Sequence, residues 1–201
     1  RSRRAGYDIV YVYAAHGIMT LLYQFLLTRY NQRTDEYGGS LENRVRLVRE
    51  VLEDTKDAIG HDTAVAFRFA VDELMGENGM HAAEAEDIVG SLAEIPDLWD
   101  VNVADWGNDS LPSRFGVEGA QADYIRFVKN LTTKPVVGVG RFTSPDTMVS
   151  QIKRGVLDMI GAARPSIADP FLPSKIEQGR VDEIRECLRC KLCTPGDYIA
   201  H

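Results

Sequence analysis

Five short apolar stretches recur along the chain, and an amphipathic segment separates each stretch from the next. The stretches lie at residues 8–15, 63–70, 98–105, 134–140 and 157–165. Each is nearly uniformly apolar, as strands are when helices cover a parallel sheet. The alternation of strands and helices therefore predicts an α/β protein with a parallel sheet.

The segments between these stretches carry helix signals. In the segment 40–60, Ser40 is a suitable cap, apolar side chains recur at helical spacing, and Gly60 provides a stop. A long polar loop is expected between residue 16 and this helix. Further helices are expected at 81–95, 121–131 and 144–155, with shorter helical pieces at 170–179 and 181–187.

Polar residues gather where the predicted strands end. Hydrophobic periodicity by itself does not separate an open doubly wound sheet from a (β/α)8 barrel. In such barrels, however, the active site forms at the carboxyl ends of the strands. The polar positions favour the barrel; they are His16, Arg68, Asp105, Trp106, Gly140, Arg141 and the stretch 161–164.

The charge balance limits the class of partner. With 23 Lys and Arg against 30 Asp and Glu, the net charge is −7, which disfavours nucleic acid and anionic membranes as partners. No apolar run approaches the ~20 residues of a membrane-spanning helix, and no signal peptide is recognisable. The three cysteines are bunched rather than spread as in a disulfide framework. These features predict a cytoplasmic protein.

Two glycine-containing strand ends, VGVGRFTSP and IGAARPS, have the composition of an anion site. Small residues such as Gly140 and Ala163 let backbone N–H groups approach a phosphate, and Arg141 and Arg164 add positive charge. The first segment also leads into a helix N-terminus, and the last two loops of a barrel often bind phosphate. The alternative is a pair of tight turns whose arginines form surface ion pairs.

Three other sets of polar side chains each allow two interpretations. Arg68 interrupts an apolar strand and must meet an anionic partner, either a carboxylate on a neighbouring strand or the electron-rich edge of a cofactor. Trp106 is either a core residue or a pocket wall for an alkylammonium group. Tyr13, His16 and Asp109 form a candidate proton-handling set, although a His at a strand end is more often structural.

The strongest local motif is CxxCxxC near the end of the sequence. It consists of Cys187, Cys190 and Cys193. Thiolates at this spacing are typical of iron–sulfur ligation. The alternatives are a zinc site of three cysteines and His201, or plain reduced thiols.

The segment YNQRTDEYGGSLENRVRLVREV resembles the loop and helix after the fourth barrel strand in the Old Yellow Enzyme class of flavoproteins. GVGRFTSP, GAARPSIADPFLPSKIEQGR and the closing CxxCxxC resemble the branch of this class that adds an iron–sulfur cluster. Within that branch, VYVYAAH and ADWGNDSLPSRF look most like trimethylamine and dimethylamine dehydrogenases and related N-methyl amine demethylases. The dienoyl-CoA reductases are similar too, but they lack the tryptophan-to-aspartate segment.

This resemblance implies a role for each candidate residue. Tyr13, His16 and Asp109 match the family's catalytic triad, and Trp106 matches one wall of its pocket for the methylated amine. Arg68 matches the arginine beside the pyrimidine end of FMN. The FMN phosphate site is matched by Gly140, Arg141, Ala163 and Arg164, and three of four ligands to a [4Fe–4S] cluster by Cys187, Cys190 and Cys193.

The implied reaction moves a hydride or its equivalent from an N-methyl carbon to FMN, and the iminium is then hydrolysed to formaldehyde. Electrons would leave through the [4Fe–4S] cluster to an electron-transfer flavoprotein. One alternative within the same class is an enoate or 2,4-dienoyl-CoA reductase that uses NAD(P)H. The alternative outside enzymes is a fragment that is inactive by itself.

Five strands do not close an eight-stranded barrel. The expected fold is therefore an incomplete (β/α)8 TIM barrel with about strands 4 to 8 present. Residues 1–180 would be the C-terminal part of the FMN-binding barrel, and residues 181–201 the start of the iron–sulfur segment. The first three strands and the fourth cluster ligand would then lie outside this sequence. Open sheet edges and exposed apolar faces would also favour a homo-oligomer.

Overall fold

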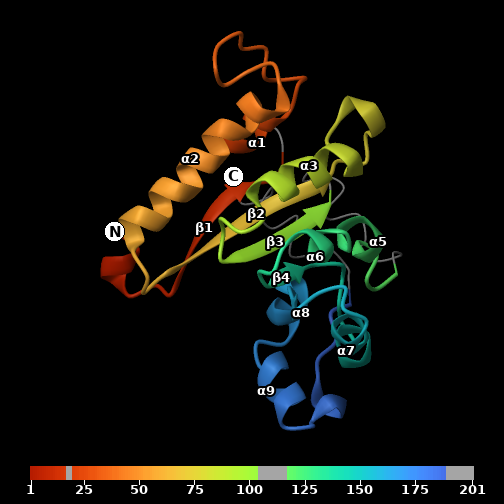
Figure 1. Ribbon diagram of the computed structural model, residues 1–201. Coiled ribbons are helices and arrows are strands. Elements are labelled where there is room, and N and C mark those ends of the chain that lie inside the picture. The colour runs from red at the N-terminus through yellow and green to blue at the C-terminus, as the bar shows by residue number, and fades with distance from the viewer. Residues whose placement is uncertain (17–19, 104–116, 189–201) are drawn as a thin grey trace, which may run out of the picture.

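The computed structural model describes residues 1–16, 20–103 and 117–188, and within them five strands form one parallel sheet (Figure 1). The order in the sheet, β1-β2-β3-β4-β5, follows the chain. Right-handed crossovers that always step to the next strand place the connecting helices on one face. The predicted parallel α/β sheet is confirmed, with strands β1 (Ile9–Ala14), β2 (Ala64–Asp72), β3 (Leu98–Val103), β4 (Val136–Gly138) and β5 (Met159–Ile160).

Helices connect these strands and follow the last one. Ser40 caps the longest helix, α2, as expected, because its hydroxyl accepts a hydrogen bond from Asn43 N. No helix in the described ranges is long and apolar enough to cross a membrane. The helical elements are η1 (Arg3–Ala5), α1 (Leu21–Leu26), α2 (Leu41–Ile59), η2 (Gly76–Asn78), α3 (Ala82–Leu92), α5 (Ala122–Ile125), α6 (Val128–Leu131), α7 (Pro145–Lys153), α8 (Ala163–Ala168), α9 (Leu172–Glu177) and η3 (Val181–Glu183).

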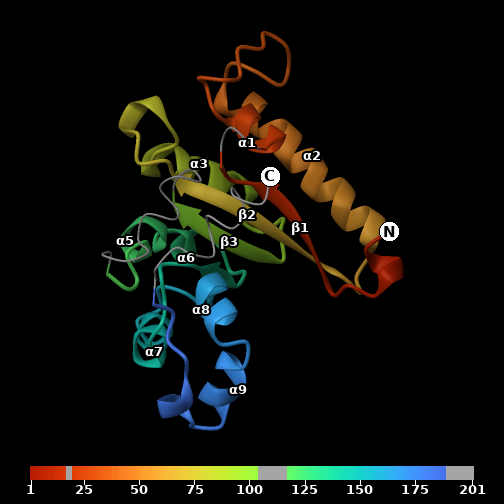
Figure 2. The ribbon, with the colours of Figure 1, turned by 180° about the vertical axis from the view of Figure 1, so that it is seen from behind.

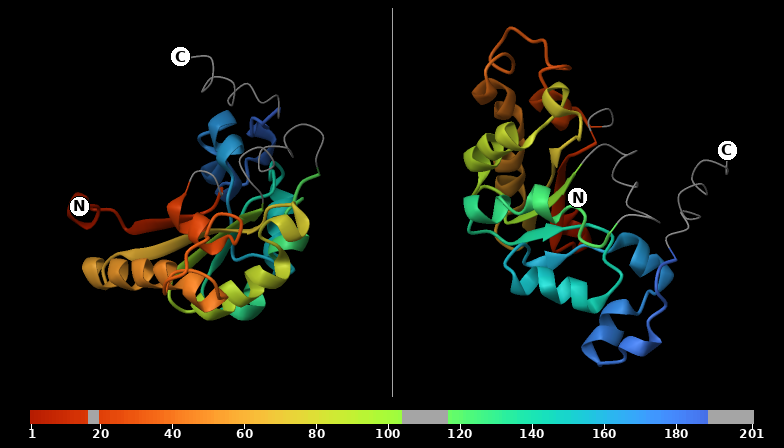
Figure 3. Two further views of the ribbon diagram at one scale, coloured as in Figure 1. Left: turned by 90° about the horizontal axis from the view of Figure 1, so that it is seen from above. Right: turned by 90° about the vertical axis from the view of Figure 1, so that its right-hand side faces the viewer.

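One face of the sheet packs against the helices and forms the apolar core. Seen from above, α2 and α3 lie along the same side of the sheet (Figure 3). Phe67 and Trp99 are fully buried there, with ring centroids 5.3 Å apart in an edge-to-face arrangement. Tyr23 of α1 extends this cluster, because its ring contacts Phe69 and its hydroxyl donates to the Ala70 carbonyl at 3.0 Å. These contacts bury the helix-facing side of β2 and β3.

The opposite face of the sheet has a different character. Figure 2 shows this side, where α2 and α3 do not cover β1 and β2. The strand register sets Tyr13 beside Arg68 and Arg68 beside Asp100, so the three side chains share this face. Tyr11 is 50% exposed and Met159 is 43% exposed at its two edges. We call this side the open face.

The structure corrects four details of the sequence prediction. Residues 21–26, expected within a polar loop, form α1 because Tyr23 and Leu26 are buried against the sheet. The strand expected at 157–165 ends at Ile160, and α8 begins at Ala163 with Pro165 in its first turn, where a missing N–H does little harm. The helix at 121–131 is broken into α5 and α6, and only Val181–Glu183 of the piece at 181–187 is helical.

Candidate active site at the carboxyl ends of the strands

Backbone strain is concentrated just after three of the strands. Among the described residues, the non-glycine positions with positive φ are His16 at 58°, Leu74 at 55° and Arg141 at 64°. They follow β1, β2 and β4, so all three lie at the carboxyl-terminal edge of the sheet. Left-handed conformations are costly for such residues and cluster at functional sites. This edge is therefore the candidate functional edge, as the sequence predicts.

Tyr13 and His16 meet at the end of β1. The Tyr13 hydroxyl shares a hydrogen bond with Nδ1 of His16, and the two ring centroids are 5.8 Å apart at an interplanar angle of 27°. His16 is only 4% exposed, whereas Tyr13 remains 37% exposed on the open face. The left-handed backbone of His16 turns the chain back so that its ring reaches Tyr13. A buried imidazole bonded to a more accessible phenol is able to relay a proton.

Arg68 lies next to this pair and is bound to Asp100 on the adjacent strand. Its Nη1 donates to both carboxylate oxygens of Asp100, at 3.0 and 2.8 Å, and its guanidinium carbon lies 5.9 Å from the Tyr13 ring centroid. The two side chains are 20% and 10% exposed. Of the two partners considered for Arg68, the carboxylate on a neighbouring strand is therefore present.

Asn102 is a candidate residue that the sequence interpretation missed. It follows Asp100 by two positions in β3, so it shares the open face near the strand end. Its side chain is fully buried, and neither the amide nitrogen nor the amide oxygen has a hydrogen-bond partner in the described parts of the chain. An unsatisfied buried amide is costly and needs an explanation. Period-two alternation of polar residues in LWDVNVAD is the signal that identifies Asp100 and Asn102 together.

The two glycine-containing strand ends are constrained by packing. A Cβ at Gly140 would lie 3.3 Å from the Cα of Gly119, and one at Gly161 would lie 2.7 Å from Cγ1 of Val139. The Gly161 N–H already donates to the Gly138 carbonyl at 2.8 Å. Close packing therefore accounts for these glycines, and the predicted phosphate site depends on the nearby arginines.

The start of α7 is occupied by a carboxylate of this chain. Glu118 Oε1 accepts hydrogen bonds from the backbone N–H groups of Thr143 and Ser144, each at 3.1 Å, and from the Thr143 hydroxyl. Burial raises the pKa of the Glu118 carboxyl, but the hydrogen bonds from Thr143, Thr147 and Ser144 together hold this pKa below its ordinary value. A phosphate at the same place would meet this negative charge, so the helix N-terminus suggested by the sequence is already filled.

Arg141 and Arg164 remain as the positive groups of the predicted phosphate site. Nε and Nη1 of Arg141 are buried next to its strained backbone. Arg164 and Ala163 lie in the first turn of α8, and no hydrogen bond or ion pair engages the Arg164 guanidinium within the described ranges. Arg164 is thus available to an external anion.

The remaining predicted residues are described only in part. Trp106, Asp109, Cys190 and Cys193 lie outside the described residues. Cys187 is described, is not in a disulfide and is partly exposed. In the described part of the chain, no three His, Cys, Asp or Glu residues form a metal-binding group. The cluster motif therefore stays a sequence prediction.

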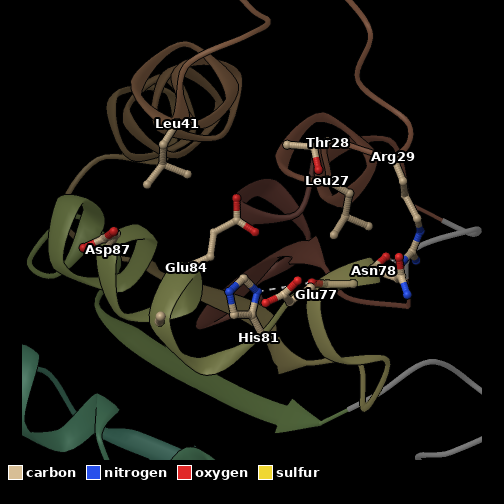
Figure 4. Close-up of a pocket in the computed structure, with 11 residues that line it drawn as sticks. Leu27, Thr28, Arg29, Leu41, Glu77, Asn78, His81, Glu84 and Asp87 are labelled. Atoms are coloured by element: carbon tan, nitrogen blue, oxygen red, sulfur yellow. Dashed lines mark hydrogen bonds between the residues drawn. The ribbon is translucent and has the colours of Figure 1, made fainter.

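A separate cavity of about 420 Å³ lies between α3 and the region joining α1 to α2 (Figure 4). It contains none of the predicted site residues. Glu84 extends into it from α3, as Figure 4 shows, and is paired with Arg44 at 2.5 Å. Arg29, on the opposite wall, is paired with Glu73 at 2.7 Å. The charges of Glu84 and Arg29 are therefore already paired within the chain.

A parallel α/β sheet with strained, polar strand ends is the arrangement found in barrel enzymes. The chain belongs to the NADH:flavin oxidoreductase / NADH oxidase family, which its residues 1–183 match. The resemblance to flavoproteins of the Old Yellow Enzyme class is thereby confirmed. The similarity to amine dehydrogenases is confirmed by individual relatives.

Three relatives illustrate this similarity. Dimethylamine dehydrogenase of Hyphomicrobium sp. (strain x) is 47% identical over 197 residues, which are 96% of this chain and 26% of that protein. The structure of 6-hydroxypseudooxynicotine amine oxidase from Pseudomonas geniculata N1 is 62% identical with a TM-score of 0.92, covering 96% of this chain and 29% of that one. Histamine dehydrogenase from Rhizobium sp. 4-9 is 53% identical with a TM-score of 0.93, covering 98% and 28%. This chain thus spans less than a third of these relatives.

The family implies FMN, and several residues at this edge fit such a cofactor. Arg164 offers a positive charge without a described partner, as a phosphate group requires. Among the described residues, the buried amide of Asn102 has no hydrogen-bond partner, and a polar ring edge could supply one. For an iron–sulfur cluster, the thiol of Cys187 fits as a ligand because it forms no disulfide within the described residues and is partly exposed.

Proposed function

We propose that this chain is the part of an FMN-dependent oxidoreductase that oxidatively demethylates a methylated amine. In the proposed reaction, FMN supplies the acceptor for a hydride or hydride equivalent from the N-methyl carbon. The electrons are passed through a [4Fe–4S] cluster to an electron-transfer flavoprotein, and the protein is cytoplasmic and homo-oligomeric. Residues 1–180 are the C-terminal part of its FMN-binding (β/α)8 barrel, and the cluster segment begins at residue 181.

The observation that carries the proposal is the Tyr13–His16 pair beside Arg68 on the open face. A methylated amine must lose its proton before it gives up a hydride, because the nitrogen lone pair stabilises the iminium that forms. The accessible hydroxyl of Tyr13 takes up that proton as it passes its own proton to His16, and Asp109 orients the imidazole. Trp106 forms a wall of the amine pocket, where the face of an indole attracts an alkylammonium group.

The other predicted residues hold the cofactor. Arg68 faces the pyrimidine edge of FMN, where a fixed positive charge favours the electron-rich form. Asp100 keeps the Arg68 guanidinium in place through two hydrogen bonds. Arg141 and Arg164, with Gly140 and Ala163 beside them, bind the phosphate. Cys187, Cys190 and Cys193 supply three cluster ligands.

Substrate profiling of the full-length protein tests the proposal. The purified protein should show flavin absorbance and reduce an artificial dye when a methylated amine is added. His16→Ala should lower this turnover by about 10²–10⁴-fold, the usual contribution of a positioned acid or base. The assigned roles are wrong if His16→Ala and Asp109→Ala keep wild-type turnover with several methylated amines.

A reductase function is the second candidate, because similarity to reductases is also present. The structure of a 2-naphthoyl-CoA reductase is 29% identical with a TM-score of 0.84, and cinnamate reductase of Clostridium sporogenes is 32% identical. Reduction of a dienoyl thioester by NADPH, without any amine oxidation, would favour this candidate and overturn the first.

A further inference from the structure

The segment that leads to Cys187 is held by a buried carboxylate. Asp169, which is fully buried, accepts a hydrogen bond from the backbone N–H of Arg185 at 2.9 Å. Lys175 of α9 binds the same carboxylate at 2.7 Å and also donates to the Glu183 carbonyl at 2.8 Å. The hydrogen bond from Lys175, followed by that from Arg185 N, lowers the pKa of Asp169 to about 2. Asp169 and Lys175 thus fix two backbone atoms of the segment 183–186.

A second anchor lies immediately before the cysteine. The Oε1 atom of Glu186 is 3.0 Å from the Thr143 hydroxyl, and Thr143 itself is only 5% exposed. Thr143 follows Arg141 by two positions, its backbone N–H donates to Glu118, and its single hydroxyl proton is shared between the carboxylates of Glu118 and Glu186. Through this contact, the residue next to Cys187 is tied to the strand end that carries the predicted FMN phosphate site.

Folding stability by itself does not explain why this segment has two such anchors. Residues 181–183, 185 and 186 are exposed, and Ile184 packs only partly against the core. A buried ion pair adds little net stability, because desolvation offsets the attraction between its charges. Such pairs do fix geometry, since a charge that loses its partner inside the protein is strongly destabilised. The two anchors therefore specify a position for Cys187 more than they add folding free energy.

We propose that Asp169, Lys175 and Thr143 are positioning residues. They hold Cys187 at a fixed place relative to the strand ends, where its thiol acts as a cluster ligand. This inference rests on the proposed function, because it takes the CxxCxxC motif to bind an iron–sulfur cluster. In the described part of the chain, their side chains make no hydrogen bond to Cys187, and they act through the backbone of 183–186 and the side chain of Glu186.

The test measures cluster retention in the full-length protein. Flavin, iron and acid-labile sulfide are quantified per protein, and the rate of iron release to a ferrous chelator is followed anaerobically. Asp169→Asn should release iron about tenfold faster, as expected when the support of a metal ligand is lost. Thr143→Val should also speed release, whereas Thr143→Ser, which keeps the hydroxyl, should restore the wild-type rate. Flavin per protein should stay unchanged in all three variants.

Arg180→Gln is the matched control, because the Arg180–Glu183 ion pair is in the same segment but its side chains are 44% and 56% exposed. Its iron release should equal that of the wild type. The inference is overturned if Asp169→Asn and Thr143→Val release iron at the wild-type rate. If Asp169→Asn fails to fold and bind flavin, the comparison of iron release in Thr143→Val and Thr143→Ser tests the inference instead. A wild-type protein that binds flavin but no iron would instead overturn the cluster part of the proposed function, and this inference with it.

Discussion

Strand β2 takes part in two environments, because Phe67 and Phe69 face the helices while Arg68 faces the other way. The helix-facing side is apolar, fully buried and built on aromatic contacts with Trp99. The open face carries Tyr13, Arg68 and Asp100, whose hydrogen bonds and charges have specific partners. The helix-facing side therefore supplies folding free energy, whereas the open face and its strained edge provide chemistry. Substitutions on the two sides should separate these contributions.

The largest loss of stability should come from the helix-facing side. Trp99→Ala removes a fully buried indole together with its hydrogen bond to the Ala93 carbonyl. We expect a loss of about 3–5 kcal/mol, the range for Trp or Phe to Ala in a packed core. Urea unfolding followed by circular dichroism measures it. Met159→Ala, on the exposed edge of the open face, is the matched control and should stay within about 0.5 kcal/mol. Equal losses of stability in the two variants would contradict the difference between the helix-facing side and the open face.

A smaller loss should follow when the ion pair of the open face is broken. Arg68→Met leaves Asp100 without its main partner, and we expect about 2 kcal/mol, less than the 3–5 kcal/mol of a fully buried pair. The double variant Arg68→Met/Asp100→Leu should recover most of it, because no lone charge remains. If the double variant were less stable than Arg68→Met alone, the ion pair would be a net stabiliser and the open face would resemble the core energetically.

A substitution of Asn102 should not lower the free energy of unfolding, in contrast to Trp99→Ala and Arg68→Met. Its amide is buried without a described partner, so Asn102→Leu should be neutral or stabilising by about 1 kcal/mol. Asn31→Leu is the control, since the Asn31 amide donates to the carbonyls of Phe25 and Tyr37, each at 2.7 Å, and its loss should destabilise the chain. In the full-length protein, Asn102→Leu should lower flavin content. A clear loss of stability in Asn102→Leu would mean that protein atoms already satisfy this amide.

Much of the fold could be predicted because the apolar stretches and their order in the sequence determine the strands of the sheet. The five strands and the cap at Ser40 follow from local composition. Helix α1 was missed because its helicity depends on burial of Tyr23 against Phe69, a contact between residues far apart in sequence. The end of β5 was misplaced because the chain turns into α8 at Ala163, where the Ser166 N–H donates to the Ala162 carbonyl at 3.2 Å, and the run of small and apolar residues does not reveal this turn.

The sequence predicts which residues belong to the candidate site more readily than it predicts which side chains they bind. Tyr13 and His16 are three positions apart at a strand end, and the structure does bring them together. The partner of Arg68 depends on the register of β2 and β3, so Asp100 could not be assigned from sequence alone. Glu118 was missed for the same reason, because it meets the start of α7 from a distant loop.

The most direct test of the account is the rate at which a methylated amine reduces the flavin of the full-length protein. Tyr13→Phe removes the hydroxyl that meets His16, whereas Tyr11→Phe alters a tyrosine two positions earlier on the same face. Stopped-flow absorbance should show reduction slowed by about 10²-fold or more in Tyr13→Phe and unchanged in Tyr11→Phe, with both folding free energies within about 0.5 kcal/mol of the wild type. Equal rates in the two variants, or a flavin that only NAD(P)H reduces, would contradict the account.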